Sequence, residues 1–249
     1  MSFVVRTERP DEWKAVASLI STLVDEATFE VTSEGLSFRA MDPSHVAMLD
    51  LFWPNSGFER FECDGEVKFT IRIDEFNKIL KRSKRNDEVE LRSSGEGLEV
   101  KLEGNYKRSF ELHFIESTYA PARSPKFSFK AKCLVDIATF RDILKDIGRV
   151  SDHVTIEARK GELLFIGKGE TGTAKVELVE GQPELKELSI EEESRSTYSI
   201  KFISDVTNPA SKLTDETSIE FSSKLPLKLG FKLGDTGGKV DFYLAPRLE

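Results

Sequence analysis

Apolar side chains recur at helical spacing in four stretches of the chain. The longest stripe consists of Trp13, Val16, Ala17, Ile20, Leu23 and Val24, which follow the i, i+3, i+4, i+7 pattern of a half-buried helix. Shorter stripes predict helices over 76–80 and 137–147, each preceded by an aspartate that suits an N-cap, Asp74 and Asp136. A fourth helix is predicted over 199–207, ending at Asn208-Pro209 because proline disrupts helices.

Segments with alternating apolar and polar residues follow each predicted helix. An aspartate precedes each of them: Asp25, Asp87, Asp152 and Asp215, at spacings of 62, 65 and 63 residues. The alternation, interrupted by glycine-containing turns, is typical of half-buried strands. Because the spacing is so regular, we predict four repeats, each a helix followed by a β-meander.

Two repeats per domain predict an α+β fold, with helices packed on one face of antiparallel sheets. The stretch 116–126 (ESTYAPARSPK) has no periodicity and contains Pro121 and Pro125, which indicates an extended connector. We therefore expect two similar domains, 1–115 and 127–249, joined by a connector at 116–126.

Composition and charge narrow the function classes. The 249 residues include 36 basic and 44 acidic side chains, a formal net charge of −8, which argues against a protein coated in positive charge. No stretch approaches the length of a membrane span, and the two cysteines lack disulfide or zinc-site spacing, so we expect a cytoplasmic protein without membrane contact. The three histidines stand in no catalytic or metal-binding motif. No catalytic residue, metal or cofactor is predicted, and we expect a protein that is not an enzyme.

Basic side chains gather around the predicted helices. Lys78, Lys81, Arg82 and Arg85 have helical spacing, as do Arg141, Lys145 and Arg149. A solvated helix face is the alternative explanation for either group by itself. Because no aromatic residue is interleaved, contact with DNA phosphates without base reading is favoured. The predicted DNA-binding residues are Lys14, Lys78, Lys81, Arg82, Lys84, Arg85, Arg141, Lys145, Arg149, Lys201 and Lys212.

Three stretches of the sequence resemble a known family. They are LVDEATFEVTSEGLSFRAMDPSHVAMLDL (23–51), NKILKR (77–82) and YLAPRL (243–248), and they are similar to sliding clamps of archaea and eukaryotes, proliferating cell nuclear antigen, in its archaeal form. The resemblance implies a DNA clamp fold, a trimeric ring of like subunits around duplex DNA, and action as a processivity factor for DNA polymerase. It also implies clamp loader, DNA polymerase, flap endonuclease and DNA ligase as partners in replication and repair.

A ring of subunits needs strand edges that pair with each other. The segments 107–114 and 173–179 alternate and suit this purpose, and in the family these edges join across subunits. The predicted subunit-interface residues are Phe110, Leu112, Ala174, Val176 and Leu178.

A second surface is predicted for partner peptides. Apolar residues without an obvious place in the core flank the loop 42–45, and others lie near the C-terminal strand. In the family, these segments converge beside the connector into a pocket for short client motifs. The predicted residues are Met41, His45, Val46, Met48, Pro121, Leu225, Pro226, Tyr243, Leu244, Ala245 and Pro246. Ordinary packing of a C-terminal strand is the alternative.

Two rival interpretations stay open. A β-rich enzyme that uses scattered carboxylates would need a convergent motif, which the sequence does not offer. One subunit of a heterotrimeric clamp, unable to form a ring alone, fits the same sequence. The native mass of the purified chain would separate this last interpretation from a ring of identical subunits.

Overall fold

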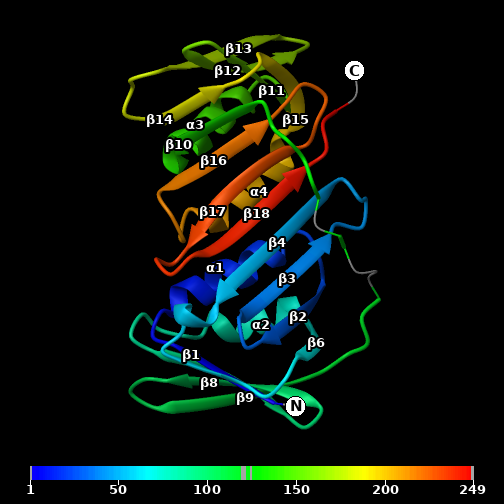
Figure 1. The fold of residues 1–249 in the computed structure, drawn as a ribbon, viewed down its shortest axis with the longest axis vertical. Helices are drawn as coiled ribbons and strands as arrows, with labels where there is room; N and C mark the ends of the chain where they lie inside the picture. Colours follow the sequence, from blue (N-terminus) through cyan, green and yellow to red (C-terminus); the bar gives the residue numbers. More distant parts are fainter. Residues whose placement is uncertain (1, 119–121, 124, 248–249) are drawn as a thin grey trace. The chain divides into compact units, whose positions relative to one another are not determined.

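The structure is a computed structural model that describes residues 2–118, 122–123 and 125–247. The chain forms two compact units (Figure 1). Unit 1 comprises Met1–Ser124 with Lys232–Val240, and unit 2 comprises Pro125–Phe231 with Asp241–Glu249. The tip of the last hairpin therefore belongs to unit 1, and its two outer ends belong to unit 2.

A motif of one strand, one helix and three strands occurs four times along the described chain. The first motif, in unit 1, is β1 (Phe3–Thr7), α1 (Pro10–Ile20), β2 (Glu26–Thr32), β3 (Gly35–Met41) and β4 (Ala47–Pro54). The second, also in unit 1, is β6 (Val67–Arg72), α2 (Ile73–Leu80), β7 (Glu88–Ser94), β8 (Gly97–Glu103) and β9 (Lys107–His113). The third motif is β10 (Ala131–Asp136), α3 (Ile137–Ile147), β11 (His153–Arg159), β12 (Glu162–Gly169) and β13 (Gly172–Val179). The fourth is β15 (Ser194–Ser199), α4 (Ile200–Ala210), β16 (Glu216–Phe221), β17 (Leu227–Leu233) and β18 (Gly238–Leu244).

The predicted fourfold repetition is confirmed, with one addition. Each helix is preceded by a strand that the sequence pattern did not predict, because these strands are short and run directly into the helices. A 3-10 turn, η1 (Asn55–Gly57), and β5 (Arg60–Cys63) follow the first motif, and β14 (Leu185–Ile190) follows the third.

Each unit contains two groups of antiparallel strands. In unit 1, β5, β1, β7, β8 and β9 pair in that order, and we call this the β7 sheet; β4, β3, β2 and β6 pair in a second group. In unit 2, β13, β12, β11 and β15 form the β11 sheet, and β14, β10, β16 and β17 form the other group. The two units thus share a core of equivalent strands, and they differ in the extra strand: β5 pairs with β1 in the β7 sheet, whereas β14 pairs with β10 in the other group of unit 2.

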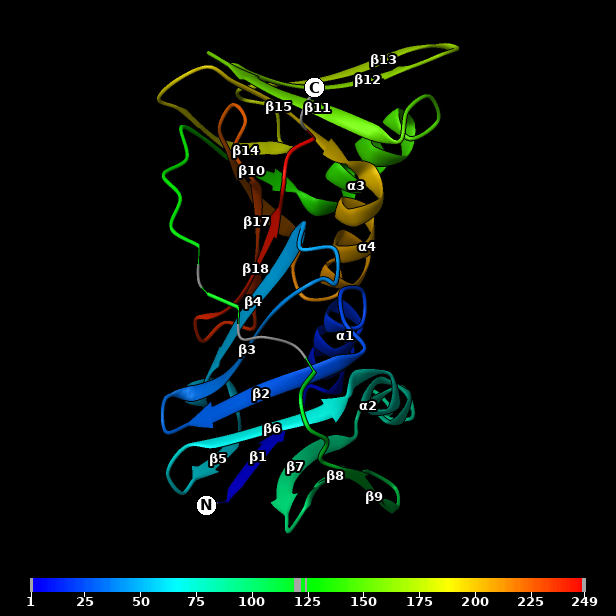
Figure 2. The same ribbon diagram turned by 90° about the vertical axis from the view of Figure 1, so that its right-hand side faces the viewer.

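The helices cover one face of the strands in each unit. Helix α1 contacts α2, and α3 contacts α4, β11, β12 and β13, with α3 and α4 beneath the β11 sheet in Figure 2. In unit 1, the buried Trp13 ring lies 4.8 Å from the Trp53 ring and 5.8 Å from the Phe76 ring. In unit 2, Phe140 packs 5.8 Å from Phe165. Large aromatic groups therefore join helices to strands in both cores.

The repeated aspartates hold the motifs of a unit together. The first helical N–H of α2, at Ile73, donates to the carbonyl of Asp25 at 3.0 Å. In unit 2, Ile137 donates to the Asp215 carbonyl (2.9 Å) and Ile200 to the Asp152 carbonyl (3.0 Å). Helix α1 begins with Pro10, which has no N–H to donate. For Asp25, Asp152 and Asp215, this role comes from the backbone carbonyl.

Two predicted helix boundaries are wrong. Helix α4 continues through Asn208-Pro209 to Ala210, because a proline in the last turn removes only one backbone bond while Ser211 still donates to the Thr207 carbonyl at 3.0 Å. Asp136 caps α3 as predicted, accepting from Thr139 N–H at 2.7 Å, whereas Asp74 lies inside the first turn of α2.

Candidate functional site

The predicted DNA-binding residues divide between the helices and the turns that follow them. Lys14, Lys78, Arg141, Lys145 and Lys201 lie on helices, and Lys81, Arg82, Lys84, Arg85, Arg149 and Lys212 lie in the turns. The prediction of a basic stripe along one helix around Lys78 is therefore wrong. Helix α2 ends at Leu80, whose carbonyl accepts from the Ser83 hydroxyl at 2.7 Å and from the Ser83 N–H. This bonded turn replaces a further helical turn.

The lysines on the helices are each paired with a carboxylate on the same helix. The pairs are Lys14–Asp11 (3.0 Å), Lys78–Asp74 (3.3 Å), Lys145–Asp142 (2.7 Å) and Lys201–Asp205 (2.7 Å). Within the described residues, the six cations of the turns make no ion pair with a carboxylate. Among the predicted DNA-binding residues, the turns therefore hold most of the cations that are not neutralised by a nearby carboxylate.

The basic turn 81–85 is anchored to strand β9. The buried carboxylate of Asp87 accepts from the Lys84 N–H at 2.7 Å and pairs with Arg108, which also donates to the Arg82 carbonyl at 2.7 Å. Burial raises the pKa of Asp87, but these donors outweigh it and hold the pKa below its usual value. The sequence analysis identified the repeated aspartate and missed Arg108 as its partner.

Arg141 is engaged differently from the other predicted DNA-binding residues. Its Nε donates to Asn208 Oδ1 at 3.1 Å and its Nη1 to Ser211 Oγ at 3.0 Å, both at the end of α4. The side chain is half-buried. Arg141 therefore joins α3 to α4, and we expect it to contribute less to phosphate contact than the exposed Lys145.

The segments predicted for subunit pairing are edge strands. Strand β9 ends the β7 sheet, and β13 ends the β11 sheet. On both strands the apolar positions share one face, with Leu112 and Leu178 buried, while Phe110, Ala174 and Val176 are half-buried. Among the described residues, three large apolar side chains are exposed, and two of them flank these strands: Tyr106 (54%) precedes β9 and Val179 (42%) ends β13.

The loop predicted to receive partner peptides in unit 1 is organised by Asp42. Its buried carboxylate accepts from the N–H groups of Ser44 (3.0 Å), Val46 (2.8 Å) and Ala47 (2.7 Å). His45 stands at its exposed tip with φ 59°. The sequence analysis missed Asp42, although an aspartate before Pro-Ser is a turn signal.

Only part of the predicted peptide site in unit 1 is accessible. Met41 and Val46 are half-buried, whereas the side chain of Met48 is 5% exposed and lies opposite Met41 across β3 and β4. Met48 is therefore buried, although the alternation of β4 places its side chain on the same face as Met41 and opposite to the fully buried Leu49, Leu51 and Trp53.

The predicted site residues in unit 2 form a second local group. Leu225, Pro226, Tyr243 and Pro246 are half-buried, Ala245 is exposed and Leu244 is buried. The hydroxyl of buried Tyr198 donates to the Leu225 carbonyl at 2.9 Å, which holds this loop to β15. Pro121, the predicted contribution of the connector, lies outside the described residues.

The connector begins against the open face of β2. Thr118 donates through both its N–H and its hydroxyl to the carboxylate of Glu26, at 3.2 and 2.8 Å. Ser117 and Ala122 line a pocket of about 210 Å³ on this face. The rest of the lining is mainly polar and charged, with residues such as Glu26 and Lys68.

Comparison with known proteins decides the family. The model for the proliferating cell nuclear antigen N-terminal domain matches residues 5–114, and the model for its C-terminal domain matches residues 124–247. The chain belongs to the proliferating cell nuclear antigen family. It is 40% identical over 249 residues to the DNA polymerase sliding clamp of Nitrosopumilus maritimus, covering 100% of both chains, and 39% identical over 243 residues to that of Thermococcus onnurineus, covering 96% and 97%.

Solved structures of the family agree with this assignment. The proliferating cell nuclear antigen of Thermococcus kodakaraensis matches with a TM-score of 0.93 and 28% identity, over 98% of this chain and 100% of the other. The PCNA2–PCNA3 complex of Sulfolobus tokodaii matches with a TM-score of 0.91 and 29% identity, over 99% and 100%. The function is that of a DNA polymerase sliding clamp of archaeal type, and the predicted fold and function are confirmed.

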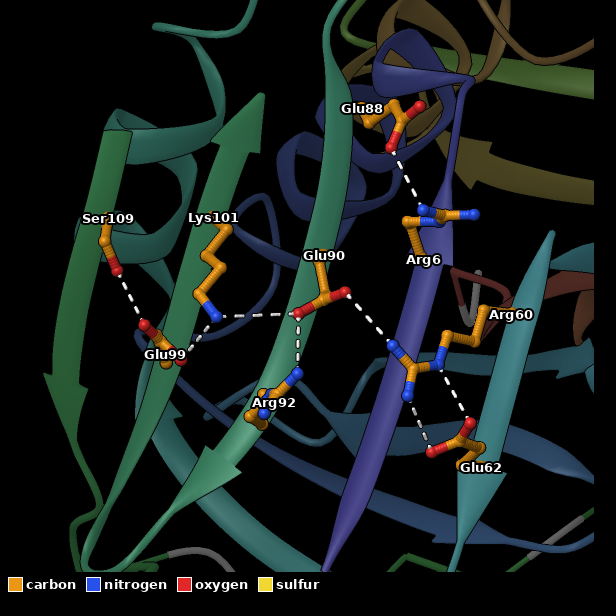
Figure 3. Close-up of polar contacts among 9 residues, drawn as sticks. All are labelled: Arg6, Arg60, Glu62, Glu88, Glu90, Arg92, Glu99, Lys101 and Ser109. Atoms are coloured by element: carbon orange, nitrogen blue, oxygen red, sulfur yellow. Dashed lines mark hydrogen bonds and ion pairs between the residues drawn. The ribbon is translucent and has the colours of Figure 1, made fainter. Parts of the chain in front are cut away.

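The open face of the β7 sheet in this clamp is a network of ion pairs (Figure 3). Glu90 is its centre, with a side chain 15% exposed that meets Arg92 at 3.2 Å, Lys101 at 3.7 Å and Arg60 at 3.9 Å. Glu99 accepts from the Ser109 hydroxyl (2.8 Å), which with Lys101 lowers the pKa of Glu99. A pocket of about 210 Å³ on this face is lined by Arg6, Glu88, Glu90, Lys101, Glu103 and Lys107. The pocket is thus lined by equal numbers of cations and carboxylates.

The β11 sheet presents the matching face of unit 2. Glu90 and Thr155 lie three residues after the equivalent aspartates, Asp87 and Asp152. The row Arg6, Glu90, Lys101 and Ser109 across the β7 sheet corresponds to Thr197, Thr155, Ile166 and Lys175 across the β11 sheet. By the same register, Glu88 corresponds to His153 and Glu103 to Lys168. The carboxylates of the first face have no counterpart at these positions.

Other chemistry is sparse in the described part of the clamp. Cys63 and Cys133 are free, and burial raises the pKa of the Cys133 thiol to about 12, which keeps it protonated. Within residues 2–118, 122–123 and 125–247, no cluster of histidine, cysteine or carboxylate side chains could hold a metal ion. In the same residues, no helix is long and apolar enough to cross a membrane.

Proposed function

We propose that this clamp acts as a trimeric ring of identical chains that encircles duplex DNA on the archaeal chromosome, and that it holds client proteins there without catalysing a reaction itself. The observation that carries the proposal is a long edge strand with an apolar face in each unit, β9 and β13, in a chain of this family. When each subunit joins the next through two different edges, head to tail, the subunits form a closed ring if the rotation from one subunit to the next closes the circle.

The side chains favour one register for this pairing. With Phe110 opposite Val176 in an antiparallel ladder, the apolar faces of both strands coincide and Glu111 stands opposite Lys175. The same register brings the exposed Tyr106 and Val179 to one end of the ladder. A slip of two residues in one direction would instead oppose Glu111 to Glu177, a like-charge pair that is unfavourable.

The interface is tested by mass in solution. Val176→Asp places a charge in the centre of the ladder, so light scattering should show chains of 28.1 kDa in place of about three times that mass. Lys160→Asp, in the exposed turn before β12, is the matched control and should keep the ring. Glu111→Lys should weaken the ring, and adding Lys175→Glu should restore it. Full trimers from Val176→Asp would show that the subunits join elsewhere.

The proposed DNA contacts are tested by comparing turn and helix cations. Arg82→Glu with Arg85→Glu removes charges without carboxylate partners, so the slope of log affinity against log salt should fall by about 2 or more. Lys145→Glu with Lys201→Glu should change the slope less, because both lysines already pair with aspartates. Rings loaded on circular DNA should stay bound and leave after linearisation. Equal retention on linear DNA would contradict encirclement.

The proposed clients carry a short motif with a glutamine and apolar and aromatic anchors, and they include DNA polymerase, the clamp loader, flap endonuclease and DNA ligase. Exposed Ala245 and half-buried Pro246 support docking at the end of β18. Ala245→Asp should lower the affinity for a motif peptide at least about tenfold, because the new carboxylate loses water on binding. Unchanged affinity in a variant with wild-type circular dichroism would place docking elsewhere. Met48 is unsuitable for this test because it is buried.

A second candidate function is one position in a ring of different subunits. The Sulfolobus tokodaii structure, a PCNA2–PCNA3 complex, is the observation that favours it. A chain of this kind would remain near 28.1 kDa alone and reach ring mass only with partner chains.

A further inference from the structure

A pocket of about 370 Å³ lies on the open face of the β11 sheet in unit 2. It is lined by Ser151, His153, Thr155, Lys168, Arg195, Thr197 and Arg247. Three cations, an imidazole and three hydroxyls face this space and no carboxylate does, in a chain whose net charge is −8. We infer that this pocket binds the carboxylates of an acidic peptide segment that belongs to a client protein.

The donors of the pocket converge from separate strands. Arg247 is fixed to the edge of β15, since its N–H donates to the Thr197 carbonyl at 2.8 Å, and its Nη1 lies 3.0 Å from His153 Nδ1. The Thr155 and Thr197 hydroxyls are 2.8 Å apart and share one hydrogen bond, which leaves a hydroxyl hydrogen for a ligand. Lys168 makes no ion pair with a described residue.

One cation of the pocket is partly neutralised. Arg195 Nη1 meets Glu157 at 3.3 Å, and Glu157 also pairs with Arg159. Glu157 lies outside the pocket lining, so the guanidinium of Arg195 keeps donors for a ligand. Lys168, Arg195 and Arg247 together leave an excess of positive charge that a run of carboxylates would match.

The fold does not require this excess of positive charge. At register-equivalent positions of the β7 sheet, the clamp has Glu88 for His153, Glu90 for Thr155 and Glu103 for Lys168, and there the cations are balanced within the chain. The two faces share backbone pairing and differ in side chains. The pocket of unit 2 thus lacks these three carboxylates, so its cations are available to the carboxylates of a ligand.

The position of the pocket favours a protein ligand over DNA. Helices α3 and α4 cover the opposite face of the β11 sheet (Figure 2), and the proposed DNA contacts lie on those helices and their turns. Arg247 follows directly after Ala245-Pro246, where the client motif is proposed to dock. The inference therefore rests on the proposed client docking, and it adds that residues flanking the motif are acidic.

The affinity of the intact clamp for labelled peptides tests this inference. The probes are a motif peptide, the same peptide with four glutamates before or after the motif, and versions with four glutamines at those places. One glutamate flank should raise affinity about five- to tenfold at low ionic strength, through two or three ion pairs that salt screens. Lys168→Gln with Arg195→Gln should abolish this gain and leave the affinity of the glutamine versions unchanged.

A matched control removes two cations from the equivalent face of unit 1. Lys101→Gln with Arg60→Gln changes the net charge equally and should keep the full gain, because those cations serve Glu90. Loss of the gain in both double variants would reduce the effect to overall charge and overturn the inference. A glutamate flank that adds nothing to a motif that binds would also overturn it.

A second measurement separates failure of the inference from failure of the proposed docking. Tetraglutamate without any motif is titrated into the isotope-labelled clamp, and the amide resonances of Thr155, Lys168 and Thr197 are followed. Shifts confined to this face would support the acidic site even if the motif peptide did not bind at all. Shifts elsewhere, or none, would overturn it.

Discussion

The β7 sheet of unit 1 and the β11 sheet of unit 2 share the order of four equivalent strands, β1-β7-β8-β9 and β15-β11-β12-β13, but the side chains on their open faces differ in charge. On the first, Glu90 gathers three cations, and Glu62, Glu88 and Glu99 each have a partner (Figure 3). On the second, Thr155 occupies the position of Glu90, and of the three pocket cations Lys168, Arg195 and Arg247 only Arg195 has a carboxylate partner, Glu157, among the described residues.

This difference shows what a repeated fold leaves free to vary. The inward positions of both sheets, such as Leu91 and Ile156, are fully or almost fully buried and must stay apolar. The outward positions face water and carry no such requirement. The β7 sheet therefore carries an ion network at these positions, in which cations and carboxylates neutralise one another, while the β11 sheet leaves cations available to a ligand.

The largest expected effect comes from breaking the network of unit 1. Glu90→Gln leaves three cations without their common carboxylate, so we expect unit 1 to lose about 2 kcal/mol of unfolding free energy. Both tryptophans, Trp13 and Trp53, lie in unit 1, so their fluorescence during urea unfolding reports this change. Glu30→Gln, which removes the exposed carboxylate partner of Lys68 in the same unit, is the control and should cost less than about 0.5 kcal/mol.

A smaller effect is expected from converting one face into the other. Glu88→His, Glu90→Thr and Glu103→Lys together give the β7 sheet the side chains of the β11 sheet at equivalent positions. Tetraglutamate should then shift amide resonances on β7 and β8, which it should not affect in the wild type. If a folded triple variant bound no acidic peptide, Arg195 or Arg247, which the triple variant does not supply on the β7 sheet, would be essential to the site in unit 2.

The smallest effect concerns acid. The Ser109 hydroxyl and Lys101 lower the pKa of Glu99 in the folded state, so Glu99 stabilises the fold above about pH 4.3, its unfolded pKa, and this contribution disappears as pH falls through the lower folded value. The stability difference between wild type and Glu99→Gln should be about 0.5 kcal/mol at neutral pH and should disappear in acid, once the pH is below the lowered folded pKa of Glu99. A difference independent of pH would mean that Glu99 acts through packing.

Much of the fold could be predicted from the sequence, because the apolar patterns and the aspartates recur at regular spacing. The helical stripe from Trp13 and the aspartate spacing indicated four repeats, and alternation identified β9 and β13 as strands suited to an edge. The strands ahead of the helices escaped prediction, since a short apolar run such as 3–7 does not distinguish strand from coil by periodicity.

The candidate sites were less predictable, because they depend on where elements stop and which side chains turn inward. Lys81 and Arg82 have helical spacing, yet the turn at Ser83 ends α2 before them. Met48 lies on the same face of β3 and β4 as Met41, yet it is buried there, which alternation along the strand does not predict. Arg108 and Asp87 meet only through the return of β9, which no local pattern reveals. The acidic-peptide pocket needed the register of two sheets to become visible.

The hydrogen bonds that join the start of each helix in unit 2 to a carbonyl of the other motif have a consequence for how the chain folds. In unit 2, the amide of Ile137 bonds to the Asp215 carbonyl of the next motif, and the amide of Ile200 bonds back to the Asp152 carbonyl. Neither motif completes the start of its own helix, so half a unit would leave a helix end unsatisfied. The two halves should therefore open together, and both amides should exchange hydrogen only through unfolding of the whole unit.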